Sequence, residues 1–101
     1  MSELSFEWDA KKAASNAAKH GVTFEEAKSV FFDDYALIIP DPDHSAVEER
    51  FVLMGLGHSM RILVVVHCYR DEGSSIRIIS ARRAGTKEQK PYWERFHEKR
   101  I

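Results

Sequence analysis

Three runs in the second half of the chain concentrate apolar side chains in the pattern of β-strands. They span residues 50–57, 61–70 and 75–83 and are dominated by valine, isoleucine and leucine. The short segments that separate them contain Gly-His-Ser and Asp-Glu-Gly-Ser, compositions that favour hairpin turns. The pattern predicts an antiparallel meander of three strands.

The start of the chain has the pattern of a strand followed by a helix. Leu4, Phe6 and Trp8 alternate with other residues, which predicts a short half-buried strand. Asp9 can cap a helix, and alanines recur at helical spacing from residue 10 to residue 18, before Gly21, a residue type that often ends helices. We therefore expect a helix over residues 10–20. Its polar face, opposite the alanines, carries Lys12, Asn16 and Lys19, with His20 in the last turn.

Two further elements precede the meander and one follows it. A capping-box pattern from Thr23 to Glu26 predicts a second short helix, and residues 35–40 have the pattern of a strand that ends at a proline. Residues 86–101 open with another Thr-x-x-Gln box, but Pro91 would break or kink a helix that had already run for one turn. We expect a short or bent terminal helix there.

These elements predict one α+β domain over residues 1–101. A short N-terminal strand and two helices precede the antiparallel meander, and a short C-terminal helix follows it. A chain of 101 residues is too small to contain a separate cofactor domain, so we expect no cofactor. Any chemistry should lie on the surface of the sheet or in a shallow cleft.

The net charge of −1 hides a difference between the two halves of the chain. Residues 1–50 hold five lysines and arginines against eleven acidic residues, a net charge of −6, and residues 51–101 hold ten against five, a net charge of +5. Most cations of the second half are arginines, the side chains best suited to bidentate phosphate contacts. A basic surface that binds an anion is therefore compatible with the near-neutral whole.

The sequence argues against several other classes of protein. The longest uninterrupted aliphatic run is residues 62–66, and residues 1–9 do not resemble a signal peptide, so we expect a cytoplasmic protein without a membrane partner. Cys68 and His67 are neighbours on a predicted strand, so their side chains leave opposite faces and cannot form a nucleophile–base pair. A metal site would need Asp41, Asp43 and His44, but a solvated turn explains that segment better, and we expect no metal.

The candidate functional residues are cationic and aromatic. Each one taken singly can be explained without a function. The lysines can form the solvent-exposed face of a helix, and His67 can be a hydrogen-bonded histidine within the sheet. The pair Arg82 and Arg83 is harder to explain in this way, because it ends an apolar strand. Strict alternation groups Arg82 with Ser80, Ile78 and Ile76, and Arg83 with Ala81, Ile79 and Arg77. One arginine should face a cleft or the helices and the other solvent or a partner; the hairpin register that would decide between them is left open.

Five segments, in this order, resemble the BrnT toxins of bacterial type II toxin–antitoxin modules. They are FEWDAKKAASNAAKHGVTFEEA, PDPDHS, ERFVLMGLG, RILVVVHCYR and IRIISARRA. The resemblance runs from about residue 6 to about residue 92, and the ordered combination of blocks is specific although each block alone is weak. It implies a RelE-like ribonuclease fold, in which helices pack on an antiparallel sheet.

The resemblance also implies metal-independent cleavage of RNA, which slows or stops translation. Such a reaction needs a base for the ribose 2′-hydroxyl, cations beside the phosphate, and an acid for the leaving 5′-oxygen. On the matching motifs, the implied phosphate stabilisers are Arg70 and Arg82 or Arg83, the acid–base groups are His67 and His20, and Lys19 or Lys12 assists electrostatically. The implied RNA-binding residues further include Trp8, for stacking on a base, and Arg77.

The partners implied by the resemblance are an RNA substrate, free or on the ribosome, and a BrnA-type antitoxin that sequesters the toxin. The module would contact operator DNA only through that antitoxin. Two alternatives remain open: an inactive partner-binding module that acts only within an operator-binding complex, and an RNA-binding domain without cleavage. Growth arrest on expression of this chain alone would support only the enzyme.

Overall fold

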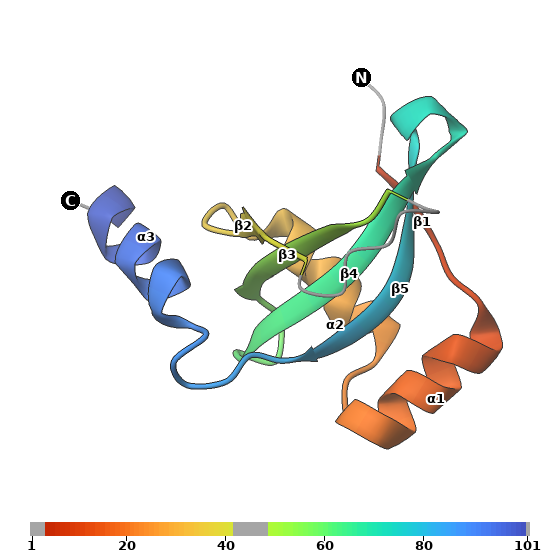
Figure 1. The fold of residues 1–101 in the computed structure, drawn as a ribbon, viewed down its shortest axis with the longest axis horizontal. Helices are drawn as coiled ribbons and strands as arrows, with labels where there is room; N and C mark the ends of the chain where they lie inside the picture. The colour runs from red at the N-terminus through yellow and green to blue at the C-terminus, as the bar shows by residue number, and fades with distance from the viewer. Residues whose placement is uncertain (1–3, 42–48, 101) are drawn as a thin grey trace.

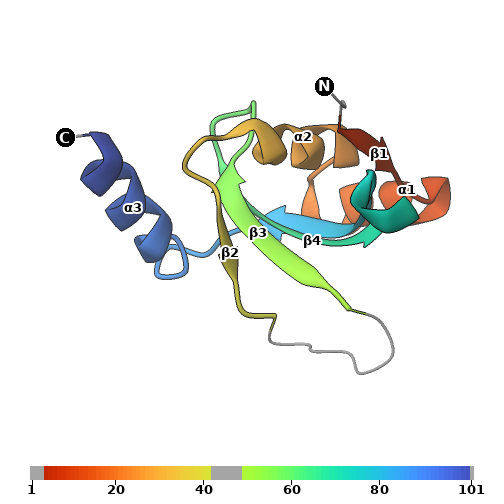
Figure 2. The ribbon, with the colours of Figure 1, turned by 90° about the horizontal axis from the view of Figure 1, so that it is seen from above.

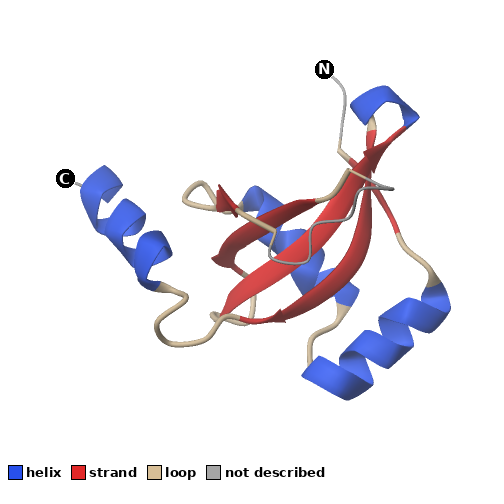
Figure 3. Ribbon diagram, in the orientation of Figure 1, coloured by secondary structure: helices blue, strands red, loops and turns tan. Residues whose placement is uncertain are grey.

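The computed structural model of this chain describes residues 4–41 and 49–100. It confirms an α+β fold, with one five-stranded sheet and three α-helices within these residues (Figures 1 and 3). The elements are, in chain order, β1 (Ser5–Glu7), α1 (Ala10–His20), α2 (Phe24–Ser29), the 3-10 turn η1 (Val30–Phe32), β2 (Leu37–Ile39), β3 (Phe51–Leu56), β4 (Ile62–Arg70), the 3-10 turn η2 (Asp71–Gly73), β5 (Ser75–Arg83) and α3 (Lys90–Arg100).

The strand order in the sheet is β1-β5-β4-β3-β2. The predicted meander is confirmed, because β3, β4 and β5 are antiparallel neighbours, and β2 continues the pattern. The sheet is nevertheless mixed, since β1 pairs in parallel with β5, with Phe6 opposite Ile76. A tight hairpin forces its two strands to run antiparallel, but almost the whole domain separates β1 from β5, so no turn sets their relative direction.

The predicted caps set the ends of the first two helices. Asp9 accepts a hydrogen bond from the backbone N–H of Lys12 at 2.9 Å, and Gly21 ends α1 in the left-handed conformation with φ of 68°. The hydroxyl of Thr23 accepts from the N–H of Glu26 at 3.1 Å and begins α2. Only three residues therefore separate α1 from α2, and their connection is correspondingly short.

The helices divide the two faces of the sheet between them. α1 and α2 lie on one side, whereas α3 stands beside the other and leaves much of it uncovered (Figure 2). The core on the helix-covered side is built from nine buried residues: Val22, Phe24, Ala27, Val30, Leu53, Leu63, Val65, Ile78 and Ala81. A second cluster on the opposite side contains Val52, Met54, Ile62, Val64, Ala84 and Tyr92.

The terminal helix is longer than the sequence predicted. The helix begins at Lys90, after the Thr-x-x-Gln box, and runs for 11 residues. Pro91 therefore lies in its first turn and does not interrupt it. A proline there removes no intrahelical hydrogen bond. Tyr92 anchors the helix: its side chain is fully buried, and its hydroxyl donates to Asp33 Oδ2 at 2.8 Å.

Candidate functional site

A bulge in β5 decides which way Arg82 points. Ser80 pairs with Val66 and Ile78 pairs with His67, which leaves Ile79 as an extra residue on β5. Strict alternation is therefore broken, and the prediction that Arg82 shares a face with Ile78 and Ile76 is wrong. Ile78 belongs to the helix-covered core, whereas Arg82 and Ser80 face a groove on the other side of the sheet.

This groove has a volume of about 360 Å³. Its apolar part consists of Val52 from β3, Val64 and Val66 from β4, and Ile39 at the end of β2 with Pro40 just after it. Polar side chains line the rest of the groove: His20, Asp41, Arg50, Ser80, Arg82 and Glu88. It therefore combines an apolar surface, which can contact a sugar or a base, with cations that can contact a phosphate.

Arg82 is held in place by Glu88. Its two terminal nitrogens donate to the two carboxylate oxygens at 2.8 and 2.7 Å, which is the bidentate geometry that a phosphate would also accept. The N–H of Gly85 donates to the same carboxylate at 2.9 Å. The hydrogen bonds from Arg82 above all lower the pKa of Glu88 to about 2, so this carboxylate is charged at neutral pH. The guanidinium is thereby oriented within the groove but not freely available.

A second ion pair lies at the same groove. Arg50 Nε is 3.5 Å from Asp41 Oδ2, and both residues are lining residues. Arg50 was not among the residues predicted from the sequence. It comes immediately before β3, and only its place beside the groove distinguishes it from other surface arginines.

A smaller hollow of about 200 Å³ lies between α1 and β5. Lys12, Ser15 and Lys19 line it from the helix, and Ile79 and Ser80 from the strand. His20 and Ser80 line both this hollow and the groove that contains Arg82. Four of the predicted residues, Lys12, Lys19, His20 and Arg82, therefore belong to one continuous site that runs from α1 across the edge of β5.

Asn16 fixes α1 to this edge. β1 pairs with β5 only at its start, through residues 75–77, so the later part of β5 has no strand beside it on that side. The buried amide of Asn16 accepts from the N–H of Ala81 at 3.0 Å and donates to its carbonyl at 2.8 Å. It also donates to the carbonyl of Val22 at 2.9 Å. The sequence pattern placed Asn16 on an exposed polar face and missed this role.

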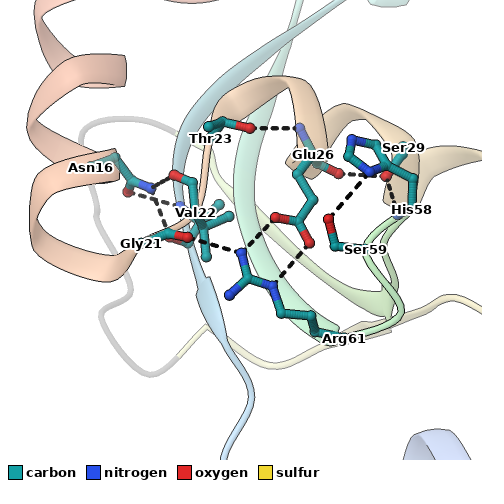
Figure 4. Close-up of polar contacts among 10 residues, drawn as sticks. Asn16, Gly21, Val22, Thr23, Glu26, Ser29, His58, Ser59 and Arg61 are labelled. Carbon is teal, nitrogen blue, oxygen red and sulfur yellow. Dashed lines mark hydrogen bonds and ion pairs between the residues drawn. The ribbon is translucent and has the colours of Figure 1, made fainter.

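Arg61 holds the other side of the connection between α1 and α2 (Figure 4). It donates to the carbonyl of Gly21 at 2.9 Å and makes a bidentate pair with Glu26 at 2.6 and 3.1 Å. The hydrogen bonds from Arg61 lower the pKa of Glu26, whose side chain is almost completely buried. The segment that follows His20 is thus fixed by side chains from α1, α2 and the β3–β4 turn.

His67 lies away from this site. Its side chain is fully buried on the helix-covered face, where the ring contacts Phe31, Phe51 and Tyr69 at centroid distances of 4.8, 6.1 and 5.4 Å. Burial lowers the pKa of His67, which favours the neutral imidazole. Its Nδ1 is 3.3 Å from the carbonyl of Val65, and Nε2 has no hydrogen-bond partner among the described residues.

The other predicted residues are dispersed. Arg70 is exposed at the far end of β4, and Arg77 pairs with Glu7 of the adjacent strand at 2.8 Å. Trp8 packs its ring against Phe24 at 5.9 Å as part of the core on the helix-covered side. Arg83 is exposed and lines a different hollow from Arg82.

The described residues contain neither a candidate metal site nor a membrane-spanning helix. Within residues 4–41 and 49–100, no group of three or more histidine, cysteine, aspartate or glutamate side chains is arranged to hold a metal ion. Asp43 and His44, two members of the metal cluster considered above, lie outside the described residues. None of the helices in the described part of the chain has the length and apolar character needed to cross a membrane.

Two comparisons identify similar proteins. A family model described as the ribonuclease toxin BrnT of type II toxin–antitoxin systems matches residues 8–88. The 1.1 Å crystal structure of the Brucella abortus ribonuclease toxin BrnT has a similar fold, with a TM-score of 0.63 and 22% sequence identity. The match covers 83% of this chain and 100% of that chain. Among curated proteins, none matches this sequence.

Proposed function

Because this chain belongs to the BrnT family of ribonuclease toxins of type II toxin–antitoxin systems, we propose that it cleaves RNA at the groove that contains Arg82. The observation that carries the proposal is that His20 lines both this groove and the hollow beside Lys12 and Lys19. An imidazole and several cations therefore line two hollows that share His20 and Ser80. This is the combination that phosphodiester cleavage by a neighbouring hydroxyl requires.

In the proposed reaction, the ribose 2′-oxygen forms a bond to the adjacent phosphorus while His20 accepts the 2′-hydroxyl proton. Arg82 and Lys19 stabilise the negative charge that builds up on the phosphate oxygens. The bond from phosphorus to the 5′-oxygen then breaks, and the protonated His20 returns a proton to that oxygen. The products are a 2′,3′-cyclic phosphate and a 5′-hydroxyl. The nucleophile belongs to the RNA and the cations to the protein, so the proposed reaction uses no metal ion.

The Arg82–Glu88 pair bears on the activity of this chain. A phosphate can replace the Glu88 carboxylate only if it interacts with Arg82 at least as well, so substrate binding must compete with an ion pair that is already formed. The same pair favours the alternative function, an inactive module that binds only its partner. Cleavage by the isolated chain decides between the two.

The test is RNA cleavage by the purified chain in the presence of EDTA, with analysis of the new ends. We expect cleavage that leaves a 2′,3′-cyclic phosphate, and a loss of about 100- to 1,000-fold for Arg82→Ala, as when one charge-stabilising donor is removed. Lys28→Ala is the control, because it removes a positive charge from α2, where the ammonium lies 5.4 Å from the ring of Phe6. A folded parent chain that leaves RNA intact would refute the enzyme and favour the inactive module.

The biological setting follows from the same proposal. The chain acts in the cytoplasm as the toxin of its module, inhibits translation by cleaving free or ribosome-bound RNA, and is neutralised by a BrnA-type antitoxin. Support comes from the family, whose description places its members in type II toxin–antitoxin systems. Induction of the chain alone should arrest growth, and co-expression with a BrnA-type antitoxin should restore it.

A further inference from the structure

A hollow of about 230 Å³ beside the end of β5 has no role in the proposed cleavage. Its lining includes Met60 from the β3–β4 turn, Arg83 at the end of β5 with Ala84 just after it, and Trp93 from the first turn of α3 with Gln89 just before the helix. Met60 is 77% exposed and Trp93 is 37% exposed. An aromatic ring, a thioether and a guanidinium therefore meet at one open surface.

The indole of Trp93 is held rigidly although part of it is exposed. Its Nε1 donates to Gln89 Oε1 at 3.0 Å, and Gln89 Nε2 in turn donates to the carbonyl of Ala84 at 3.1 Å. The ring meets the buried ring of Tyr92 edge-on at a centroid distance of 5.0 Å. A ring fixed in this way loses little conformational entropy when a flat ligand stacks on it.

Arg83 supplies a positive charge that no group in the described part of the chain neutralises. In residues 4–41 and 49–100 its guanidinium has no hydrogen-bond or ion-pair partner, whereas Arg82 is paired with Glu88 and Arg61 with Glu26. Among the residues that the structure describes, no acidic side chain lines the hollow. The local charge therefore favours an anionic ligand.

The hollow adjoins the proposed cleavage groove, because consecutive residues of the chain line the two sites. Arg82 and Arg83 are consecutive, so their Cα atoms are about 3.8 Å apart, and they line the groove and the hollow respectively. Glu88 and Gln89, also consecutive, are divided between the same two sites. Ile62, which lines the hollow, and Val64, which lines the groove, belong to the same cluster on one side of the sheet. A strand of RNA that contacts Arg82 can therefore continue along this side to Arg83.

We propose that this hollow binds an unpaired nucleobase of the RNA next to the cleaved phosphate, with the base stacked on Trp93 and a neighbouring phosphate on Arg83. The inference rests on the proposed function, because it takes the groove at Arg82 as the cleavage site. Trp93 lies beyond residues 8–88, the part of the chain that the family model matches, so this contact adds to what the family describes.

The test uses the fluorescence of Trp93 and an RNA that cannot be cleaved. Trp8→Phe leaves Trp93 as the single indole, and the probe is an eight-nucleotide 2′-O-methyl oligoadenylate, which lacks the attacking hydroxyl. We expect the probe to quench the indole. The affinity of the variants is read from the fluorescence anisotropy of a dye-labelled copy of the probe, and Trp93→Ala should weaken probe binding about 5- to 100-fold, the loss typical of one base–aromatic stack. Trp93→Phe should recover most of the affinity, and Trp93→Phe with Trp8 retained should show little quenching.

The matched ligand is an oligomer with the same phosphates but abasic sugars. It should bind more weakly than the oligoadenylate and leave Trp93 unquenched. Equal binding of the two ligands, or unchanged affinity in Trp93→Ala, would overturn the stacking site. An indole that is shielded from iodide by the antitoxin but not by RNA would make this surface a protein contact and overturn it as well.

Binding and cleavage are measured separately, so the two proposals can fail separately. If RNA quenches Trp93 in a parent chain that does not cleave RNA, the base site is supported and the ribonuclease is rejected. Suppose instead that Arg82→Ala abolishes cleavage, whereas Trp93→Ala changes neither RNA binding nor the KM of cleavage. That result would support the ribonuclease and reject the base site.

Discussion

Asn16 pairs with Ala81 as a neighbouring strand would. Its side-chain amide accepts from the N–H of Ala81 at 3.0 Å and donates to the carbonyl of the same residue at 2.8 Å. Ala81 lies between Ser80 and Arg82, the two β5 residues that line the groove. One buried side chain therefore sets the position of the helix that carries Lys19 and His20 against the strand that carries Arg82.

Replacement of Asn16 by alanine should be among the most destabilising polar substitutions in this chain. It leaves the N–H and carbonyl of Ala81 and the carbonyl of Val22 without their partner, and each buried unsatisfied group costs roughly 1–3 kcal/mol. We expect the free energy of unfolding to fall by about 2–4 kcal/mol in urea denaturation, because water can reach part of the opened site. Ser15→Ala, on the exposed side of α1, is the control. A loss below about 0.5 kcal/mol would show that the amide contributes little.

Gly55 should not tolerate a methyl group. A Cβ at this position would lie 2.9 Å from Ala36 Cβ and 2.9 Å from Val30 Cγ1, both in the packed region behind β3. We expect Gly55→Ala to lower the free energy of unfolding by about 1–3 kcal/mol through overpacking. Gly85→Ala is the matched control, because its added methyl would meet nothing closer than Glu88 Oε1 at 3.9 Å. Equal stability of the two variants would contradict the close packing at Gly55.

The element order was predictable from the sequence because each element carries its own local signal. The caps at Asp9 and Thr23 and the left-handed Gly21 act within one turn of the backbone, and the structure confirms all three. Two of the errors concern contacts between residues far apart in sequence. No local pattern sets the parallel pairing of β1 with β5, and none distinguishes an exposed Asn16 from one whose amide is bound to Ala81.

The candidate site was partly predictable for the same reason. The residue types were visible in the sequence, and Lys12, Lys19, His20 and Arg82 meet at one surface. Their arrangement depends on the bulge at Ile79. Because of this extra residue, the β5 residues before it point to the opposite side of the sheet from the side that alternation counted from Arg82 predicts. Tertiary pairing decides where a bulge forms, so alternation alone grouped Arg82 with the wrong neighbours.

His67 should affect stability rather than cleavage. Burial lowers its pKa below the usual value near 6.5, so the unfolded chain binds a proton more readily than the folded chain. The free energy of unfolding should therefore fall as the pH drops below about 6.5, until the folded state also takes up the proton. His67→Phe removes this contribution, and it replaces a buried nitrogen that has no partner in the described residues with a ring suited to the surrounding aromatic side chains.

The measurement compares urea denaturation of the parent and His67→Phe between pH 7.5 and pH 5. We expect the variant to be at least as stable as the parent at pH 7.5 and to lose less stability on acidification. RNA cleavage by the variant should stay within about threefold of the parent, because the ring lies on the opposite face from the groove. A folded His67→Phe variant without cleavage would instead make His67 part of the catalytic machinery.

His20 should be the imidazole on which cleavage depends. It is placed at the end of α1, between the two hollows, and general acid–base catalysis by one side chain contributes about 100- to 10,000-fold to a rate. We expect His20→Ala to lose activity in this range with the same melting temperature as the parent, and added imidazole to restore part of it. Rescue by imidazole requires a vacant catalytic position, so it separates a chemical role from a structural one. His58→Ala is the control, because the exposed imidazole of His58 contacts Ser59 Oγ at 3.3 Å and lines neither hollow. An equal loss in both variants, or no rescue of His20→Ala by imidazole, would move the acid–base role to another group.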